Sequence, residues 1–376
     1  MNRKWICSLA ASIVALVLLT AIGFAQQPVF IDKEPLGREA HSAVFDPNSK
    51  RMIMFGGTTG VTTQVEHLSD VWYLTNANSS GTSVSWIQAN ITGNGPSTRC
   101  CHSAVYNSTL NKMIVFGGAG GFANPTYNDV WVLNNANGVS GSPSWTPISP
   151  TGTPPASRFG HTAVYDQAHD IMIVFGGGSG DVGVVFNDVW LLTNATGNAG
   201  TPAWKLLPIT GAAPTARASH TAVYNPSTNK MIIYGGYASN GSILQDIAVL
   251  SNANGLASPS TWADELISGP VLYGHSAVYD AVHDRMTVFG GYDPNTSNGY
   301  QNAIWLLKNA SQSSLGWEGM GTLSGYALPT FGHTAVYDPV SNRMTIVGGQ
   351  IQNGEGGIGW SNSVLVLTHA NGLPIY

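Results

Sequence analysis

The stretch Arg158–Gly177, with the sequence RFGHTAVYDQAHDIMIVFGG, occurs in six variant copies along the chain. In each copy a His is followed by Ser or Thr, then Ala, Val, an aromatic residue and Asp or Asn. These histidines recur every 55 to 61 residues, at His41, His102, His161, His220, His275 and His333. Nearly equal spacing in this range indicates a solenoid or a propeller, in which each copy is one structural unit.

Each copy has the pattern of four short strands. His161–Asp166 alternates small or apolar with polar residues, and Met172–Gly177 is rich in strand formers and ends in a Gly pair. A third strand resembles Asn128–Leu133, and a fourth surrounds a lone Trp. The lone Trp residues are Trp86, Trp145, Trp204, Trp262 and Trp317.

Four antiparallel strands repeated radially form the blades of a β-propeller. We therefore predict an all-β, six-bladed propeller of four-stranded antiparallel blades. The blades are expected at about residues 38–90, 99–149, 158–208, 217–267, 272–320 and 330–367. The last copy has no lone Trp, so we expect residues 28–34 to supply its fourth strand and to hide an otherwise open edge.

The Gly pair, the aromatic residue downstream of it and the spaced Trp resemble the Kelch repeat. The chain is also similar to the propeller domain of the galactose oxidase superfamily. The resemblance covers about residues 28–376 and implies a propeller fold. Kelch propellers serve both binding and catalysis, so the resemblance alone does not choose between them.

Residues 1–25 have the pattern of a secretory signal peptide. Arg3 and Lys4 precede an apolar run, and small residues flank Phe24. We expect cleavage after Ala25, leaving a single propeller of residues 26–376 that is secreted, periplasmic or on the cell surface. The alternative is an uncleaved anchor, because about 20 apolar residues can span a bilayer.

The charge content limits the classes of partner. Charged residues make up 9% of the chain, with a net charge of −5, against roughly 25% in an ordinary globular protein. The sequence has no basic stripe, so nucleic acid is not an expected partner. We expect an extracellular protein or a glycan, and no membrane contact apart from the signal peptide.

The adjacent residues Cys100 and Cys101 are the only cysteines after the expected cleavage site. That count excludes a long-range disulfide framework. Two interpretations stay open. The pair forms either two small buried side chains or a strained vicinal disulfide in an oxidising compartment.

The loops fall into two groups that lie on opposite faces of an antiparallel blade. The turns after the first and third strands are nearly identical from copy to copy, whereas the loops after the Gly pairs vary in length and content. Variation on one face indicates that a ligand meets that face. Tyr292, Tyr300 and Trp360 lie in these variable loops and are candidates for stacking on a sugar.

The six repeated histidines are not expected to bind a metal. They lack the closely spaced partners of a zinc site. Side chains of an innermost strand point into the layers between blades, where buried polar groups are normally hydrogen-bonded. We therefore expect each His to bond to the neighbouring blade, and we predict no metal and no cofactor.

An Arg stands three residues before the His in the first four copies, namely Arg38, Arg99, Arg158 and Arg217. The Kelch resemblance implies a ligand-binding role, because arginines at this position line the channel mouth in Kelch domains that bind acidic peptides. The same four copies open their third strand with Asp70, Asp129, Asp188 and Asp246. Two strands separate the partners, about 10 Å, so we favour ion pairs within each blade.

The predicted function is binding of a polysaccharide or a protein through the variable loops. One alternative is a galactose-oxidase-like or other carbohydrate-active enzyme, and another is a structural envelope protein. A copper-radical site needs Tyr, His and a crosslinked Cys near the channel mouth, and the sequence does not assemble that set, so no catalytic residue is predicted. Titratable groups with shifted pKa at the mouth would favour the enzyme.

Overall fold

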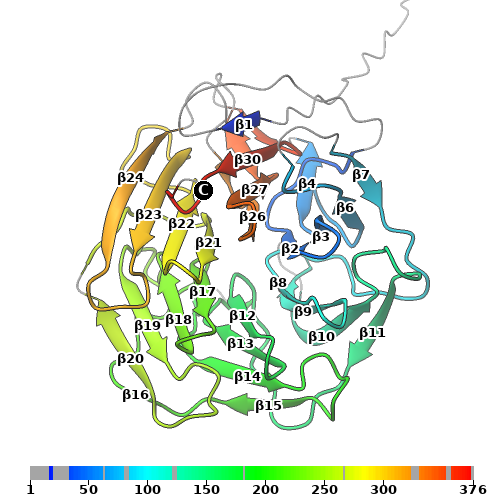
Figure 1. Ribbon diagram of the computed structural model, residues 1–376, viewed down its shortest axis with the longest axis horizontal. Coiled ribbons are helices and arrows are strands. Elements are labelled where there is room, and N and C mark those ends of the chain that lie inside the picture. Colours follow the sequence, from blue (N-terminus) through cyan, green and yellow to red (C-terminus); the bar gives the residue numbers. More distant parts are fainter. Residues whose placement is uncertain are drawn as a thin grey trace, which may run out of the picture.

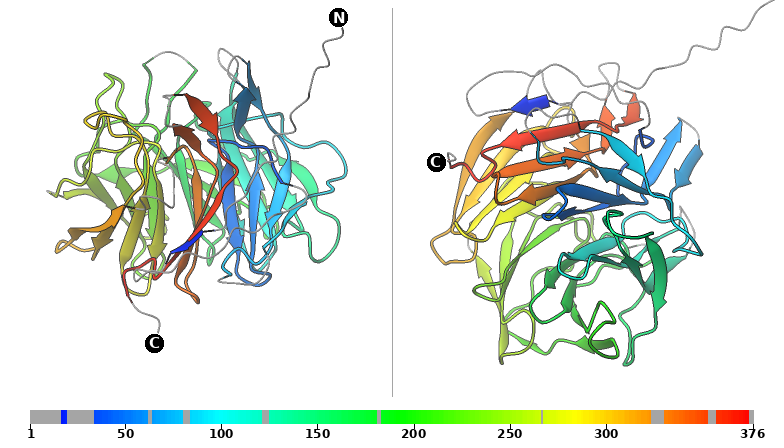
Figure 2. Two further views of the ribbon diagram at one scale, coloured as in Figure 1. Left: turned by 90° about the horizontal axis from the view of Figure 1, so that it is seen from above. Right: turned by 45° about the vertical axis from the view of Figure 1, so that its right-hand side comes forward.

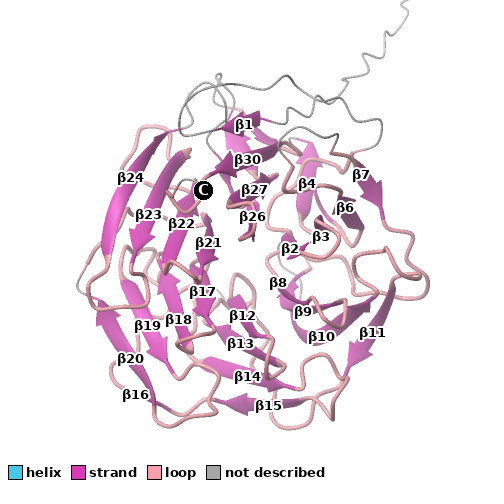
Figure 3. Cartoon of the chain, viewed as in Figure 1, coloured by secondary structure: helices cyan, strands magenta, loops and turns pink. Residues whose placement is uncertain are grey.

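The computed structural model describes residues 17–19, 34–61, 64–79, 84–120, 125–180, 183–265, 267–322, 330–352 and 357–373. Every regular element in these ranges is a β-strand, which confirms the all-β prediction (Figure 3). Accordingly, the described part of the chain contains no helix that is long and apolar enough to cross a membrane. Six sheets each carry one copy of the repeat and surround a common centre (Figure 1).

The innermost strand of each sheet follows the repeated His. These strands are β2 (Ser42–Asp46), β8 (Ser103–Asn107), β12 (Thr162–Asp166), β17 (Thr221–Asn225), β21 (Ser276–Asp280) and β26 (Thr334–Asp338). The second strands lead toward the Gly pairs. They are β3 (Arg51–Phe55), β9 (Lys112–Ala119), β13 (Ile171–Phe175), β18 (Lys230–Tyr234), β22 (Arg285–Phe289) and β27 (Arg343–Val347).

The third and fourth strands complete each sheet on the outside. The third strands are β6 (Val71–Leu74), β10 (Thr126–Asn134), β14 (Val189–Thr193), β19 (Ile247–Ser251), β23 (Ala303–Lys308) and β30 (Val364–Thr368). The fourth strands carry the lone Trp and are β7 (Trp86–Gln88), β11 (Ser144–Ile148), β15 (Ala203–Leu206), β20 (Ser260–Glu265) and β24 (Gly316–Thr322). In these five sheets the four strands pair antiparallel in sequence order, as predicted.

The sheet of the last copy is completed differently. Beside β30 lies β1 (Val17–Leu19), which pairs with it in parallel. The closing strand predicted at residues 28–34 falls outside the described residues, except for Glu34. The described edge strand thus comes from the segment that the sequence pattern assigned to a signal peptide.

Short additional strands lie outside the four-strand pattern. The hairpin of β4 (Thr58–Val61) and β5 (Gln64–His67) follows the first Gly pair. In the last copy, β25 (Thr330–Phe331), β28 (Gln350–Gln352) and β29 (Ile358–Trp360) form a separate small sheet. The two-residue strand β16 (Ile209–Thr210) adds in parallel to β20.

The hydrophobic cores lie between neighbouring sheets. One cluster joins Ile53 and Phe55 of β3 to Met113 of β9, and all three side chains are fully buried. Another joins Met52 of the first copy to Val347 of the last. Burying one such side chain contributes about 1.5–3 kcal/mol, so inter-sheet packing is the main source of stability.

The repeated histidines bond across the same boundaries between sheets. The Nε2 atom of each His lies 2.7–2.9 Å from the Ser or Thr hydroxyl that follows the His of the preceding copy. His41 closes the series by bonding to Thr334 of the last copy. This is the contact with a neighbouring blade that the sequence pattern led us to expect.

The residues directly before these histidines form a cycle of backbone hydrogen bonds. The N–H of each donates to the carbonyl of its counterpart in the preceding copy at 2.7–2.9 Å, and Ala40 donates to Gly332 of the last copy. All six have φ between 52° and 65°, which favours glycine. The members are Ala40, Cys101, Gly160, Ser219, Gly274 and Gly332. We call this set the backbone ring.

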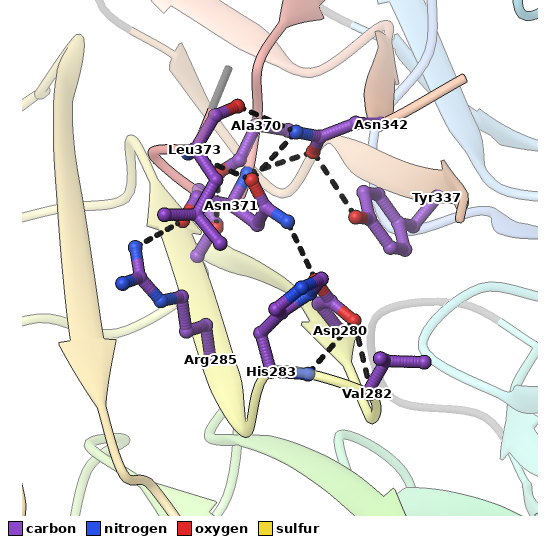
Figure 4. A network of polar contacts seen from close by, with 10 residues as sticks. Asp280, Val282, His283, Arg285, Tyr337, Asn342, Ala370, Asn371 and Leu373 are labelled. Atoms are coloured by element: carbon purple, nitrogen blue, oxygen red, sulfur yellow. Dashed lines mark hydrogen bonds and ion pairs between the residues drawn. The ribbon is translucent and has the colours of Figure 1, made fainter. Parts of the chain in front are cut away.

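The strands run between two loop-bearing faces (Figure 2). On the turn face, which carries the uniform turns, side chains lock neighbouring sheets together. Figure 4 shows Asn371, whose Nδ2 donates to Asp280 Oδ2 at 2.6 Å, while Arg285 Nη1 donates to the Asn371 carbonyl at 2.8 Å. Asn137 makes the equivalent bond to Asp46. The opposite face, with the loops after the Gly pairs, is the variable-loop face.

The four arginines before the repeated histidines are 0–1% exposed, and each lies 2.5–2.8 Å from the Asp that opens the third strand. Arg158 forms a two-pronged contact with Asp188, with its Nη1 and Nη2 donating at 2.8 and 3.0 Å. Its remaining donors reach the carbonyls of Gly176 and Ala156, and Trp190 Nε1 also donates to Asp188. Burial raises the pKa of the Asp188 carboxyl, but Arg158, Trp190 and a backbone hydrogen bond together outweigh burial, and the pKa lies below its usual value.

We predict that acid unfolds the protein with unusual steepness. Burial lowers the pKa of all six repeated histidines, to about 3 for His161, His275 and His333. Between pH 6.5 and 3 the histidines of the unfolded chain are therefore protonated while those of the folded chain stay neutral. The free energy of unfolding consequently decreases as the pH is lowered through this range. At pH 5, calorimetric unfolding in buffers of different ionisation enthalpy should show uptake of about six protons. His161→Gln should remove one of these protons, and uptake of one proton or none by the unmodified protein would contradict the expectation.

We also predict that Arg158→Ala and Asp188→Ala are strongly non-additive. Either substitution leaves a buried or half-buried charge without its partner, which costs about 3 kcal/mol. The double variant should recover about 2 kcal/mol of the summed loss in urea unfolding. Combining Arg158→Ala with Asp246→Ala, from another copy, should be additive. If the free-energy losses of Arg158→Ala and Asp188→Ala were additive, the ion pair would contribute nothing, and a ligand-binding role for Arg158 would be favoured instead.

Candidate functional site at the mouth of the central cavity

A cavity of about 1080 Å³ lies at the centre of the molecule, and residues from all six copies line it. The backbone ring surrounds it, and segments of the variable loops, including Gly178–Gly180 and Gly183–Val185, complete its wall. The cavity therefore opens on the variable-loop face. It joins the residues just before each innermost strand to the loops after the Gly pairs.

The residues immediately before the backbone ring are of five types in the six copies. They are Glu39, Cys100, Phe159, Ala218, Tyr273 and Phe331. Their backbones pair with the residues just after the Gly pairs, as in the pairing of Glu39 with Thr58 and of Phe159 with Gly178. The ring holds these positions at equivalent places around the mouth, so side-chain chemistry there changes from copy to copy while the backbone does not.

Glu39 is the charged member of this set. Its Oε1 accepts a hydrogen bond from Trp360 Nε1 at 3.1 Å and from Gln350 Nε2 at 3.2 Å. Burial raises the pKa of Glu39 to about 7, and the bond from Trp360 offsets only part of that effect. Glu39 therefore changes protonation near neutral pH.

Aromatic side chains cluster beside this carboxyl group. The ring centroids of Tyr273 and Tyr292 are 5.4 Å apart, and those of Tyr273 and Phe331 are 5.2 Å apart. Tyr237 and Tyr300 extend the cluster through edge contacts. The sequence-predicted residues Tyr292 and Trp360 thus lie in the same region, one within the cluster and one bonded to Glu39.

Cys100 and Cys101 lie on the same wall of the cavity. Their Sγ atoms are 3.0 Å apart and unbonded, and Cys101 belongs to the backbone ring. The hydrogen bond from the Cys101 thiol lowers the pKa of Cys100, whereas that bond and burial raise the pKa of Cys101. Cys100 is therefore the more acidic thiol of the pair.

The arginines predicted as candidate ligand-binding residues do not line this cavity, because their guanidinium groups face the Asp partners described above. Among the described residues, no three His, Cys, Asp or Glu side chains are grouped so as to hold a metal ion. His67 lines the cavity, and burial lowers its pKa.

Glu39, Phe159 and the Cys pair were not predicted together as one site. A signal was present, because aligning the six copies on the His shows that the position two residues earlier is variable. Glu39 is the only charged residue at that position. The alignment could not show that Glu39 contacts Trp360 and Gln350, because these two residues come from the far end of the chain.

Two family models match overlapping halves of the chain. A model of the KLHDC2/KLHL20/DRC7 Kelch-repeats domain matches residues 18–199. A model of the Attractin/LZTR1 beta-propeller matches residues 141–356. The solved structure of YjhT has the same fold, with a TM-score of 0.61 at 14% identity, and the match covers 89% of this chain and 99% of that chain.

Curated relatives match more than half of the chain. Adagio-like protein 1 of Oryza sativa subsp. japonica is 28% identical over 68% of this chain and 38% of its own length. Host cell factor homolog hcf-1 of Caenorhabditis elegans is 31% identical over 56% of this chain and 27% of its own. The chain spans less than half the length of these relatives. Since the second family model covers more than half of the chain, the chain belongs to the Attractin/LZTR1 beta-propeller family, and its repeats are Kelch repeats.

Proposed function

We propose that this chain is a secreted, closed six-bladed Kelch propeller that binds a protein partner through the mouth of its central cavity. Closure is supported by contacts between the first and last copies. Ala40 donates to Gly332 in the backbone ring, His41 bonds to Thr334, and Asn78 bonds to Asp338 on the turn face. Secretion rests on the signal-peptide pattern of residues 1–25.

The difference between the two faces carries the binding proposal. On the turn face, the turns are nearly identical from copy to copy, and hydrogen bonds between side chains of neighbouring sheets hold them, such as the bond from Asn371 to Asp280. On the variable-loop face, the loops surround a cavity with aromatic and apolar walls. Val184 is 43% exposed at this mouth. A concave site with apolar walls and a few polar groups is the usual form of a binding site.

The partner is proposed to be a protein because aromatic side chains surrounded by polar loops are typical of protein interfaces. A polysaccharide is the other ligand expected from the sequence, since Tyr292 and Trp360 offer faces for stacking on a sugar. A glycan array distinguishes the two ligands, because it detects binding of a polysaccharide but not of a protein.

The raised pKa of Glu39 favours a second candidate function, a carbohydrate-active enzyme. A carboxyl group that is half ionised near neutral pH is suited to general acid or base catalysis. In that case Glu39→Gln would abolish turnover of a sugar substrate while leaving its binding nearly unchanged. Loss of binding without any detectable turnover would favour the interaction module.

The binding proposal predicts that a substitution at the mouth weakens the complex and that a matched substitution on the turn face does not. A photoreactive residue that replaces Val184 in the mature protein would crosslink to partners present in the extracellular fraction of its host and so identify them. Val184→Glu should then weaken the purified complex at least tenfold, about 1.4 kcal/mol. Val282→Glu, at a turn-face position that is 83% exposed, should leave affinity unchanged.

Two results would overturn the proposal. One is a complex that is weakened by Val282→Glu but not by Val184→Glu, which would place the interface on the turn face. The other is binding on a glycan array with no protein crosslinked at position 184, which would identify the ligand as a polysaccharide.

A further inference from the structure

Among the described residues, the central cavity has a carboxyl group in its wall but no Lys or Arg side chain. Glu39 lines it, and the lining residues of the described chain include no Lys and no Arg. The four arginines nearest the mouth are buried in ion pairs with Asp residues. The histidines in the wall are neutral near pH 7, because burial lowers the pKa of His41, His102 and His220 well below its usual value. The charge at the mouth is therefore negative.

The Glu39 carboxyl is held in place and only partly neutralised. Oε1 accepts from Trp360 and Gln350, while Oε2 has no hydrogen-bond partner among the described residues. The Tyr300 hydroxyl donates to the Gln350 side chain, which fixes the orientation of the Gln amide. Burial raises the pKa of Glu39 to about 7, as expected for a desolvated carboxyl group without a cationic neighbour. A cation that reached Oε2 would offset this desolvation.

Aromatic rings stand beside the carboxyl group. Trp360 bonds to it directly, and Phe331 and Tyr300 belong to the cluster next to it, with centroids 6.3 Å apart. The faces of aromatic rings attract ammonium and guanidinium groups, by about 0.5–2 kcal/mol each. Phe331 lines the cavity together with Glu39, and a carboxylate beside an aromatic ring in a recess favours a cation over a neutral or anionic group of the same shape.

We propose that Glu39, Trp360 and the adjoining aromatic rings form a pocket for a cationic group of the protein partner, either the ammonium of a Lys side chain or the guanidinium of an Arg. This inference rests on the proposed function and names the chemistry that the mouth recognises. It reverses the expectation drawn from Kelch domains that bind acidic peptides, because here the arginines are occupied and a carboxylate is presented instead.

The test uses small probes and the full-length mature protein. N-acetyl-lysine methylamide and its uncharged analogue N-acetyl-norleucine methylamide differ in one ammonium group. Titration at pH 8, where Glu39 is ionised, is followed by the NMR signal of the Trp360 indole N–H. The lysine probe should bind at least tenfold more tightly than the norleucine probe and should shift that signal. Equal binding of the two probes would overturn the proposal without any variant being made.

Matched variants locate the effect. Glu39→Gln keeps the size of the side chain and an acceptor for Trp360, and it should abolish the preference for the lysine probe. Glu66→Gln, at an exposed residue of β5 outside the cavity lining, should retain it. A Glu39→Gln protein that still prefers the lysine probe by tenfold would place the cation elsewhere and refute the proposal.

The two proposals can fail separately. If Val184→Glu weakens the protein complex but the two probes bind equally, the proposed interface at the mouth is supported and the proposed cation pocket is refuted. If the probes discriminate as expected but Val184→Glu and Glu39→Gln leave the protein complex intact, the pocket exists and the partner binds elsewhere.

Discussion

The backbone ring is the constraint on which the rest of the structure depends. Six residues with left-handed backbone each donate to the preceding copy, and Ala40 joins the first copy to the last. The Gly pairs follow from the same geometry. A Cβ on Gly57 would lie 2.7 Å from the Cβ of His41 and 2.8 Å from the Glu39 carbonyl, and φ at Gly57 is 100°. The sharp turn that ends each second strand thus leaves room only for glycine, which is why the doublet recurs in all six copies.

The ring also separates structural from functional positions. The residue after each ring member is the buried His that bonds to the sheet of the preceding copy, so its chemistry is fixed. Of the residues before the ring members, Glu39, Cys100, Phe159 and Phe331 line the cavity, and their chemistry changes from a carboxyl to a thiol to an aromatic ring. The same backbone, repeated six times, therefore presents a carboxyl group, a thiol and two Phe rings to one cavity. On the opposite face, bonds such as that from Asn371 to Asp280 leave the turns no comparable freedom.

The sequence predicted the all-β fold, the four-strand order and the separation of the faces because each depends on a local pattern repeated six times. Ion pairing was inferable because two positions vary together. The Arg before the His and the Asp that opens the third strand, such as Arg158 and Asp188, occur in the same four copies, and the other two copies lack both. The environment of Glu39 was not inferable. Its partners Trp360 and Gln350 lie more than 300 residues away, and they meet it only because the first and last copies are neighbours. The parallel pairing of β1 with β30 was also missed, since a three-residue apolar strand has no distinctive signature.

Hydrogen exchange of the six ring amides tests the central claim most directly. If the ring is continuous, the N–H groups of Ala40 and Gly332, at the junction of the first and last copies, exchange as slowly as those of Gly160 and Ser219, which lie far from it. All six should then open with one common free energy. Exchange of the Ala40 amide several orders of magnitude faster than that of Ser219 would show that the ring is open at that junction, and it would contradict the account.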